Sequence, residues 1–135
     1  MKVTLKTILP LSGQPQVIEG AKKAIDKDFH TELPDVVEAA IQAYREKYME
    51  QKLVREVKKR GGLCEKWNSG SSGWPDRIVL LPDGKIGFVE VKAPGEKPRK
   101  IQVHRHDQLR ALGYKVFVLD DLGQIGGIID AIQTA

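Results

Sequence analysis

Residues 76–92 read DRIVLLPDGKIGFVEVK, and this stretch decides the fold. Two short, mostly apolar runs flank the segment 82–84 (Pro-Asp-Gly), which is typical of a β-hairpin with a three-residue loop whose glycine takes a positive φ. Counting outward from such a loop, Asp76 comes opposite Glu90. Because both runs are apolar on both faces, we expect the hairpin to lie in the centre of a covered sheet.

Two opposed carboxylates at the open end of the hairpin need a counter-charge. Directly opposed residues on antiparallel strands have Cβ atoms about 4.5–5.5 Å apart, where like charges are unfavourable unless a cation lies between them. Lys92 shares the face of Glu90 because side chains alternate along a strand. A two-residue turn would instead bring Asp76 opposite Val91 and send the acids to different faces. A solvated strand end with one surface salt bridge is the other interpretation.

The patterns around the hairpin predict an α/β fold with a central mixed β-sheet flanked by helices. The first helical pattern fits one long helix or two, and it ends at Gly61 and Gly62. The expected elements are, in order, a helix at 34–57, strands at 63–67, 76–81 and 85–92, a helix at 100–112, a strand at 115–119 and a helix at 125–132.

Residues 1–45 have a different character, and we treat them as an N-terminal extension of uncertain structure, followed by a domain at 46–135. Within the extension, residues 3–9 alternate as in a short strand, and Gln16–Lys27 fits a helix. The whole net charge of +4 falls in the later domain. Such an excess is compatible with a polyanionic partner but is too common among soluble proteins to establish one.

The composition is that of a single soluble globular domain, with 41% hydrophobic residues in 135. No apolar run approaches the roughly 20 residues needed to cross a bilayer, and residues 1–20 lack the apolar centre of a secretory signal. We therefore expect a cytoplasmic protein. The single cysteine, Cys64, excludes an internal disulfide and a multi-cysteine zinc site, and we expect its thiol to be buried in a strand.

Two further polar residues fall on apolar helix faces. Glu50 lies within the arc of the apolar positions in 53–57, and an inward carboxylate needs a basic partner or a metal. Gln102 shares a helical face with Leu109 and Leu112. The ordinary alternatives are an acid that reaches solvent from the end of the apolar stripe and a polar residue at a helix boundary.

Other suggestive residues fit ordinary roles. His104 and His106 point about 200° apart on a helix and cannot share one metal ion, so we interpret them as basic surface or phosphate contacts. The segment 70–73 lacks the Gly-Lys-Ser/Thr ending of a phosphate-binding loop and fits a flexible approach to the hairpin. Trp67 and Trp74 are able to stack on a base, although packing is the usual fate of tryptophan.

In order and spacing, the sequence resembles the PD-(D/E)XK nucleases in their VRR-NUC form over about residues 46–120. The matching pieces are Glu50, Gly61-Gly62, Gly70 to Arg77 with Gly73-Trp74-Pro75-Asp76-Arg77, Glu90-Val91-Lys92-Ala93-Pro94-Gly95, and Gln102. The resemblance implies a restriction-endonuclease-like fold and a DNA endonuclease that uses Mg²⁺ or Mn²⁺. Members of the family are associated with DNA repair, and compact versions, often phage-borne, resemble dimeric Holliday-junction resolvases. The resemblance therefore implies branched DNA as the substrate, a homodimer as the assembly, and the cytoplasm of a bacterium or phage-infected host as the location.

The chemistry of the residues agrees with the implied roles. The metal ligands implied are Asp76, Glu90, the backbone carbonyl of Val91, and Glu50, which completes or supports the site. Lys92 orients the attacking water or stabilises charge on phosphorus, and Gln102 positions water or phosphate. The candidate phosphate contacts, each more often a plain solvated charge, are Lys66, Arg77, Lys97, Arg99, Lys100 and Arg105. A non-cleaving nucleic-acid-binding module with the same fold is the alternative, and the intact acidic pair and lysine favour the enzyme.

Overall fold

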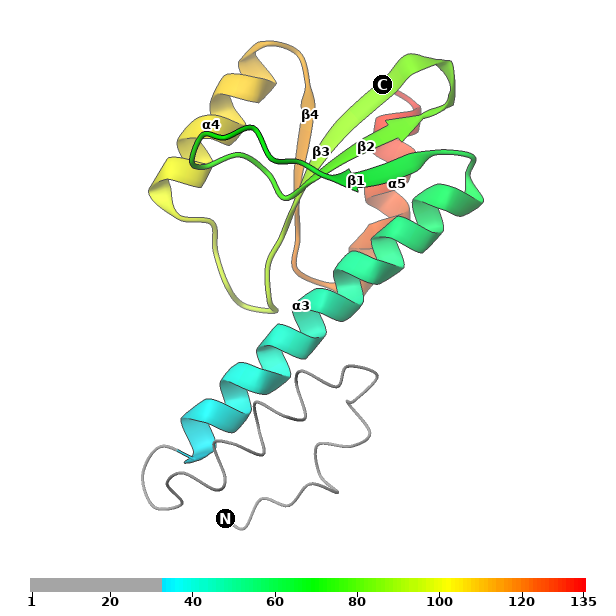
Figure 1. Ribbon diagram of the computed structural model, residues 1–135. Coiled ribbons are helices and arrows are strands. Elements are labelled where there is room, and N and C mark those ends of the chain that lie inside the picture. Colours follow the sequence, from blue (N-terminus) through cyan, green and yellow to red (C-terminus); the bar gives the residue numbers. More distant parts are fainter. Residues whose placement is uncertain (1–32) are drawn as a thin grey trace. The chain divides into compact units, whose positions relative to one another are not determined.

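The computed structural model describes residues 33–135, so the strand expected at 3–9 and the helix expected at Gln16–Lys27 lie outside the described residues. The elements, in chain order, are α3 (Leu33–Lys59), β1 (Leu63–Lys66), β2 (Arg77–Leu81), β3 (Lys85–Val91), α4 (Lys100–Ala111), β4 (Lys115–Leu119) and α5 (Ile125–Gln133) (Figure 1). This order of helices and strands agrees with the order expected from the sequence. The chain divides into two units between Lys47 and Tyr48, and the sheet belongs to the second.

The first helical pattern forms one continuous helix of 27 residues, α3. It ends where Gly61 adopts a positive φ of 79°, a conformation that glycine takes without steric cost. Basic side chains at Lys58 and Lys59 lie in the last turn, where they face the negative end of the helix dipole. Among the helices that the structure describes, none is both long and apolar enough to span a membrane.

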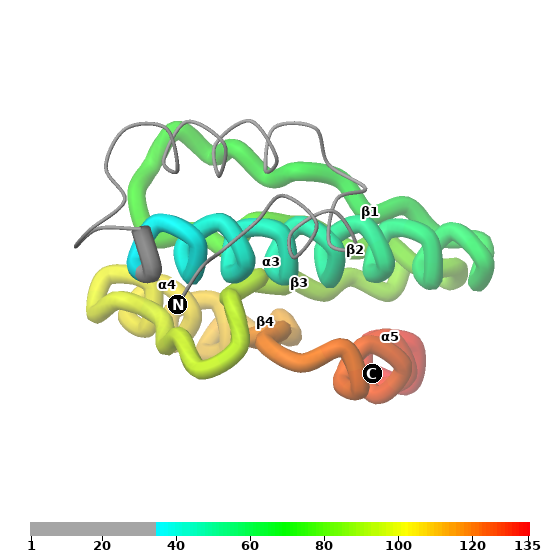
Figure 2. Tube along the Cα trace, turned by 90° about the horizontal axis from the view of Figure 1, so that it is seen from below, coloured from blue at the N-terminus to red at the C-terminus, as the bar shows by residue number. Residues whose placement is uncertain are grey.

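The four strands form one mixed sheet in the order β1-β2-β3-β4. The first three strands pair antiparallel, and β4 pairs parallel to β3. A parallel pair needs a crossover connection, and α4 supplies it. In two views α4 and α5 lie well apart (Figures 1 and 2). The molecule therefore has the predicted α/β architecture of a mixed sheet with flanking helices.

The β2–β3 hairpin has the predicted three-residue loop. Leu81 pairs with Lys85, and the predicted register continues along both strands. Asp83 and Gly84 both adopt positive φ, 68° and 73°, and an aspartate tolerates this conformation better than most residues. The strand β2 begins one residue after Asp76, so that residue lies at the open end of the hairpin.

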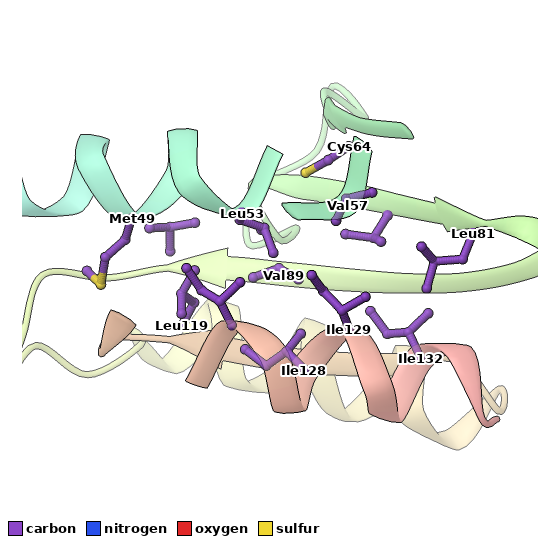
Figure 3. Close-up of a cluster of buried hydrophobic side chains, with 13 residues drawn as sticks. Met49, Leu53, Val57, Cys64, Leu81, Val89, Leu119, Ile128, Ile129 and Ile132 are labelled. Atoms are coloured by element: carbon purple, nitrogen blue, oxygen red, sulfur yellow. The ribbon is translucent and has the colours of Figure 1, made fainter. Parts of the chain in front are cut away.

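The main hydrophobic core lies between the sheet and the helices α3 and α5, where the odd-numbered residues of β2 and β3 point. Its buried members are Met49, Leu53, Val57, Cys64, Val79, Leu81, Val89, Val91, Leu119, Ile125, Ile128, Ile129 and Ile132. Figure 3 shows side chains of α3 and α5 pointing toward one another, with Val89 and Leu119 of the sheet beside them. Burial of these side chains, each stabilising by roughly 1.5–3 kcal/mol, holds the described elements together.

A glycine in β3 sets how closely α5 approaches the sheet. A Cβ atom at Gly87 would lie 2.4 Å from Cδ1 of Ile132, well inside van der Waals contact. Any other residue at this position would force the Ile132 side chain to shift, so glycine allows α5 to pack directly on the backbone of β3.

The face covered by α4 has a smaller apolar cluster. Phe88, Leu109 and Val116 are its buried members, with Trp74 and Ile78 packed against them. The three buried polar residues among those described all lie on this face: Glu90, Gln102 and His106. The expectation that Leu112 shares the buried face is wrong, because α4 ends at Ala111 and Leu112 is 74% exposed.

Candidate active site

Asp76 is fixed in place by the backbone of two neighbouring strands. Its Oδ2 accepts a hydrogen bond from the N–H of Val91 at 2.8 Å. Its own carbonyl accepts the N–H of Trp67 at 2.8 Å, just beyond the end of β1. The carboxyl group is thus held at the end of β3, next to the residues that follow Glu90.

The environment of Asp76 raises its pKa from the usual 3.8 to about 6. Partial burial of the carboxyl group is the main cause, and the negative charges of Glu90 and Glu50 add to it. The hydrogen bond from Val91 and the charge of Lys92 act in the opposite direction. The carboxylates therefore lie close enough to repel one another, which is the condition that a bound cation relieves.

Glu90 is 1% exposed and is contacted by Gln102 of α4 and by Lys92, which follows β3. Its Oε1 accepts a hydrogen bond from Nε2 of Gln102 on α4 at 2.8 Å. The Nζ of Lys92 lies 3.8 Å from the same oxygen, so the ammonium is on the same face of β3, as the strand alternation predicts. The hydrogen bond and the nearby ammonium partly offset the cost of removing this side chain from water.

Gln102 connects the start of α4 to this carboxylate. While its amide nitrogen donates to Glu90, its Oε1 accepts the N–H of Arg99 at 2.8 Å, which satisfies one of the free donors at the helix N-terminus. From the sequence we expected Gln102 to position water or phosphate. In the structure its side chain contacts Glu90, one of the candidate metal ligands.

The interpretation of His106 as a surface residue is wrong, because its side chain is 2% exposed. Its Nε2 lies 3.7 Å from Oε2 of Glu90. His106 follows Gln102 by four residues, so the two share a face of α4, and this spacing is the signal that the sequence carried. His104, two residues earlier, is exposed as expected.

Glu50 of α3 forms an ion pair with Arg77. Its Oε1 accepts from Nε of Arg77 at 2.7 Å, and the same guanidinium donates to the carbonyl of Cys64. The basic partner that an inward acid needs is therefore Arg77, which the sequence had suggested as a phosphate contact. Among the residues that the structure describes, no three His, Cys, Asp or Glu side chains are arranged as a ready metal cluster.

The segment between β1 and β2 packs against α4 through its aromatic and glycine residues. Trp67 and Trp74 contact each other with ring centroids 5.8 Å apart, and the guanidinium of Arg105 lies 5.3 Å from the ring of Trp74. A Cβ atom at Gly73 would lie 2.6 Å from the carbonyl oxygen of Ile101, so this glycine lets the segment approach the helix. The segment that leads to Asp76 is thus anchored on α4.

The remaining candidate phosphate contacts surround the start of α4 and the end of β1. The exposed members are Lys66, Lys97, Arg99 and Lys100, whereas Arg105 is half-buried. Three of the four exposed cations lie between the end of β3 and the first residue of α4, the same end of the sheet as Lys92. Positive charge and the acidic pair are therefore brought to one end of the sheet.

No family model matches the chain, whereas a curated protein and a solved structure are similar to it. Over 84 residues the chain is 55% identical to a protein named "Putative nuclease p44" from Acyrthosiphon pisum secondary endosymbiont phage 1; the match covers 60% of this chain and 90% of that protein. A solved structure described as a VRR_NUC domain is similar with a TM-score of 0.59 and 34% sequence identity. That match covers 64% of this chain and 95% of the solved chain.

Proposed function

The chain belongs to the VRR-NUC family of nucleases, and from this premise we propose that it is a Mg²⁺- or Mn²⁺-dependent endonuclease that hydrolyses DNA phosphodiester bonds. The proposal assigns the activity to a nuclease domain at 46–135. The observation that carries it is the meeting of Asp76, Glu90 and Lys92 at the open end of a buried hairpin. Paired carboxylates with an adjacent ammonium have the donor chemistry for a divalent ion and for charge stabilisation at phosphorus.

The residues present fit a hard divalent cation. Oε2 of Glu90 is buried without a hydrogen-bond partner, Asp76 offers a carboxylate beside it, and both are oxygen ligands of the kind that Mg²⁺ and Mn²⁺ prefer. We assign the metal to these two side chains and the carbonyl of Val91. Because Glu50 is paired with Arg77, we assign it a supporting role next to the ligands and not direct binding of the metal. Its negative charge raises the pKa of Asp76. A bound ion would polarise the scissile phosphate and lower the pKa of the attacking water.

The other residues of the site act on substrate and ligands. The ammonium of Lys92, which is mostly buried, orients the attacking water or stabilises negative charge that develops on the phosphate. Gln102 holds the Glu90 carboxylate in one orientation. The exposed cations near the start of α4, with Lys66 and Arg105, bind the phosphate backbone, so DNA binding should weaken as salt rises.

We further propose branched DNA, such as a four-way junction, as the substrate and a homodimer as the active form. Resolving a four-way junction requires two symmetric incisions, and a twofold-symmetric dimer supplies two equivalent sites. A panel of branched and linear DNA substrates, together with the molar mass from light scattering, tests both parts. Equal cleavage of linear duplex or a strictly monomeric enzyme would contradict them without affecting the nuclease proposal.

The central experiment compares cleavage by the wild type, Asp76→Asn and Glu90→Gln in the presence of Mg²⁺ or Mn²⁺. Each substitution keeps the shape of the side chain but removes its charge, so we expect cleavage to fall by about 100-fold or more while DNA binding is retained. Glu96→Gln removes an exposed carboxylate from the segment after β3 and should leave activity unchanged.

A second readout does not depend on cleavage. Mn²⁺ should raise the melting temperature of the wild type, and EDTA should reverse the shift, because a ligand that binds only the folded state stabilises it. The shift should be lost in Asp76→Asn. A wild type that retards DNA in gels but never nicks it with either ion would instead identify a non-cleaving nucleic-acid-binding module.

A further inference from the structure

Two buried polar atoms face each other beside the proposed metal site. Oε2 of Glu90 and Nε2 of His106 are both buried without a hydrogen-bond partner, and they lie 3.7 Å apart. Nearly all buried polar atoms in folded proteins have such a partner, because an unpaired one loses its hydrogen bonds to water without replacement. An imidazole N–H donates and a carboxylate oxygen accepts, so the two atoms are complementary, and the arrangement calls for a functional explanation.

We propose that His106 is a positioning residue for Glu90, holding its Oε2 as Gln102 holds its Oε1. The inference rests on the proposed metal-dependent function. It assigns to His106 no contact with substrate, only control of how the Glu90 carboxylate is presented. Lys92 does not fulfil this role, because the nearest Glu90 oxygen to its Nζ is Oε1, at 3.8 Å.

The geometry of α4 supports the assignment. Gln102 and His106 are four residues apart on one helix, so both side chains approach Glu90 from the same side. The present separation of 3.7 Å exceeds an ordinary hydrogen bond of about 2.9 Å by less than 1 Å. Nε2 carries a hydrogen in the imidazolium and in one of the two neutral tautomers of histidine. It can therefore donate to Glu90 whether or not the ring is charged.

The contact leaves Glu90 able to bind a metal. A carboxylate has about four lone-pair positions, and one hydrogen bond to each oxygen leaves the others free. Fixing both oxygens removes the rotation of the carboxylate that metal binding would otherwise have to restrict. Groups that hold metal ligands in this way typically change metal affinity by 10–100-fold when they are removed.

The test is Mn²⁺ affinity without DNA, measured from the electron paramagnetic resonance signal of the free ion. In His106→Gln the amide N–H has about the reach of Nε2, so we expect affinity within about threefold of the wild type. In His106→Asn the polarity is kept but the side chain is too short, and affinity should fall about tenfold or more. His104→Gln, on the exposed side of the same helix, is the matched control and should bind as the wild type does.

Thermal melting of the metal-free variants separates positioning from a merely structural role. If the asparagine and glutamine variants bind Mn²⁺ as tightly as the wild type, whatever their melting temperatures, the positioning role is overturned and the proposed nuclease function stands. If the wild type binds no Mn²⁺, both proposals fail together. Should His106→Asn not fold, His106→Leu provides the same comparison, and weaker binding in that variant supports the role of the donor.

Discussion

The two faces of the sheet differ in what they bury. The face toward α3 and α5 buries aliphatic residues and Cys64, whereas the face toward α4 buries a small apolar cluster together with Glu90, Gln102 and His106. Burial of apolar area stabilises a fold in proportion to the area, but a buried charge stabilises only when its partners offset its desolvation. The comparison indicates that the first face supplies most of the stability and that the second holds the candidate site.

The largest effect is expected from truncating the apolar face. Leu53 is fully buried in the main core, and Leu53→Ala should lower the free energy of unfolding by about 4 kcal/mol. Leu109→Ala, in the smaller cluster toward α4, should lower it by about 2 kcal/mol because fewer apolar neighbours surround it. Urea denaturation followed by circular dichroism measures both values. Equal losses would contradict the division of stability between the faces.

A smaller effect is expected where α5 rests on β3. Gly87→Ala places a methyl group against Ile132, and it should destabilise the protein by about 1–3 kcal/mol. Gly126→Ala is the matched control within α5, where a Cβ meets nothing within 4 Å, and it should stabilise by about 0.5–1 kcal/mol. Melting temperatures that move in the same direction would show that α5 does not pack as tightly on β3 as described.

The last prediction changes no residue and concerns the titratable cysteine of the apolar face. Burial raises the pKa of Cys64 from 9.0 to about 11. Because the thiolate is the reactive form, its fraction at pH 8 is about 100-fold lower in the folded protein than in the unfolded chain, and reaction with a thiol reagent should slow at least accordingly. The fold favours the neutral thiol, so this contribution to stability is complete below about pH 9 and is lost as pH rises through 11. If the native protein reacts at pH 8 as fast as the protein unfolded in urea, the thiol is not buried as described.

The hairpin could be predicted because its determinants are local. The Pro-Asp-Gly loop fixes where pairing begins, and alternation along the strands then fixes which residues share a face. The predicted register is confirmed at each described pair of β2 and β3, including Ile78 opposite Phe88. The same local rule places Glu90 and Lys92 on one face, and their ion-pair distance agrees with it.

Other features depended on partners that the sequence does not specify. The spacing of His104 and His106 excluded a shared metal site but did not reveal that the second histidine faces Glu90 across 16 residues of chain. Arg77 alternates away from the acidic pair and meets Glu50, 27 residues earlier, so a residue that looks like a phosphate contact is engaged in an ion pair. These contacts arise from the packing of α3 and α4 on opposite faces of the sheet.

The sequence by itself determined the order of the elements, the register of the central hairpin and the apolar character of its strands, because each follows from loop length and periodicity over a few residues. Only the tertiary structure decided which face each helix covers and, with it, which polar side chains meet. Gln102 and His106 acquire a role beside Glu90 because α4 lies on the even-numbered face of β3. That choice depends on burying apolar area over the whole sheet, and no local pattern encodes it.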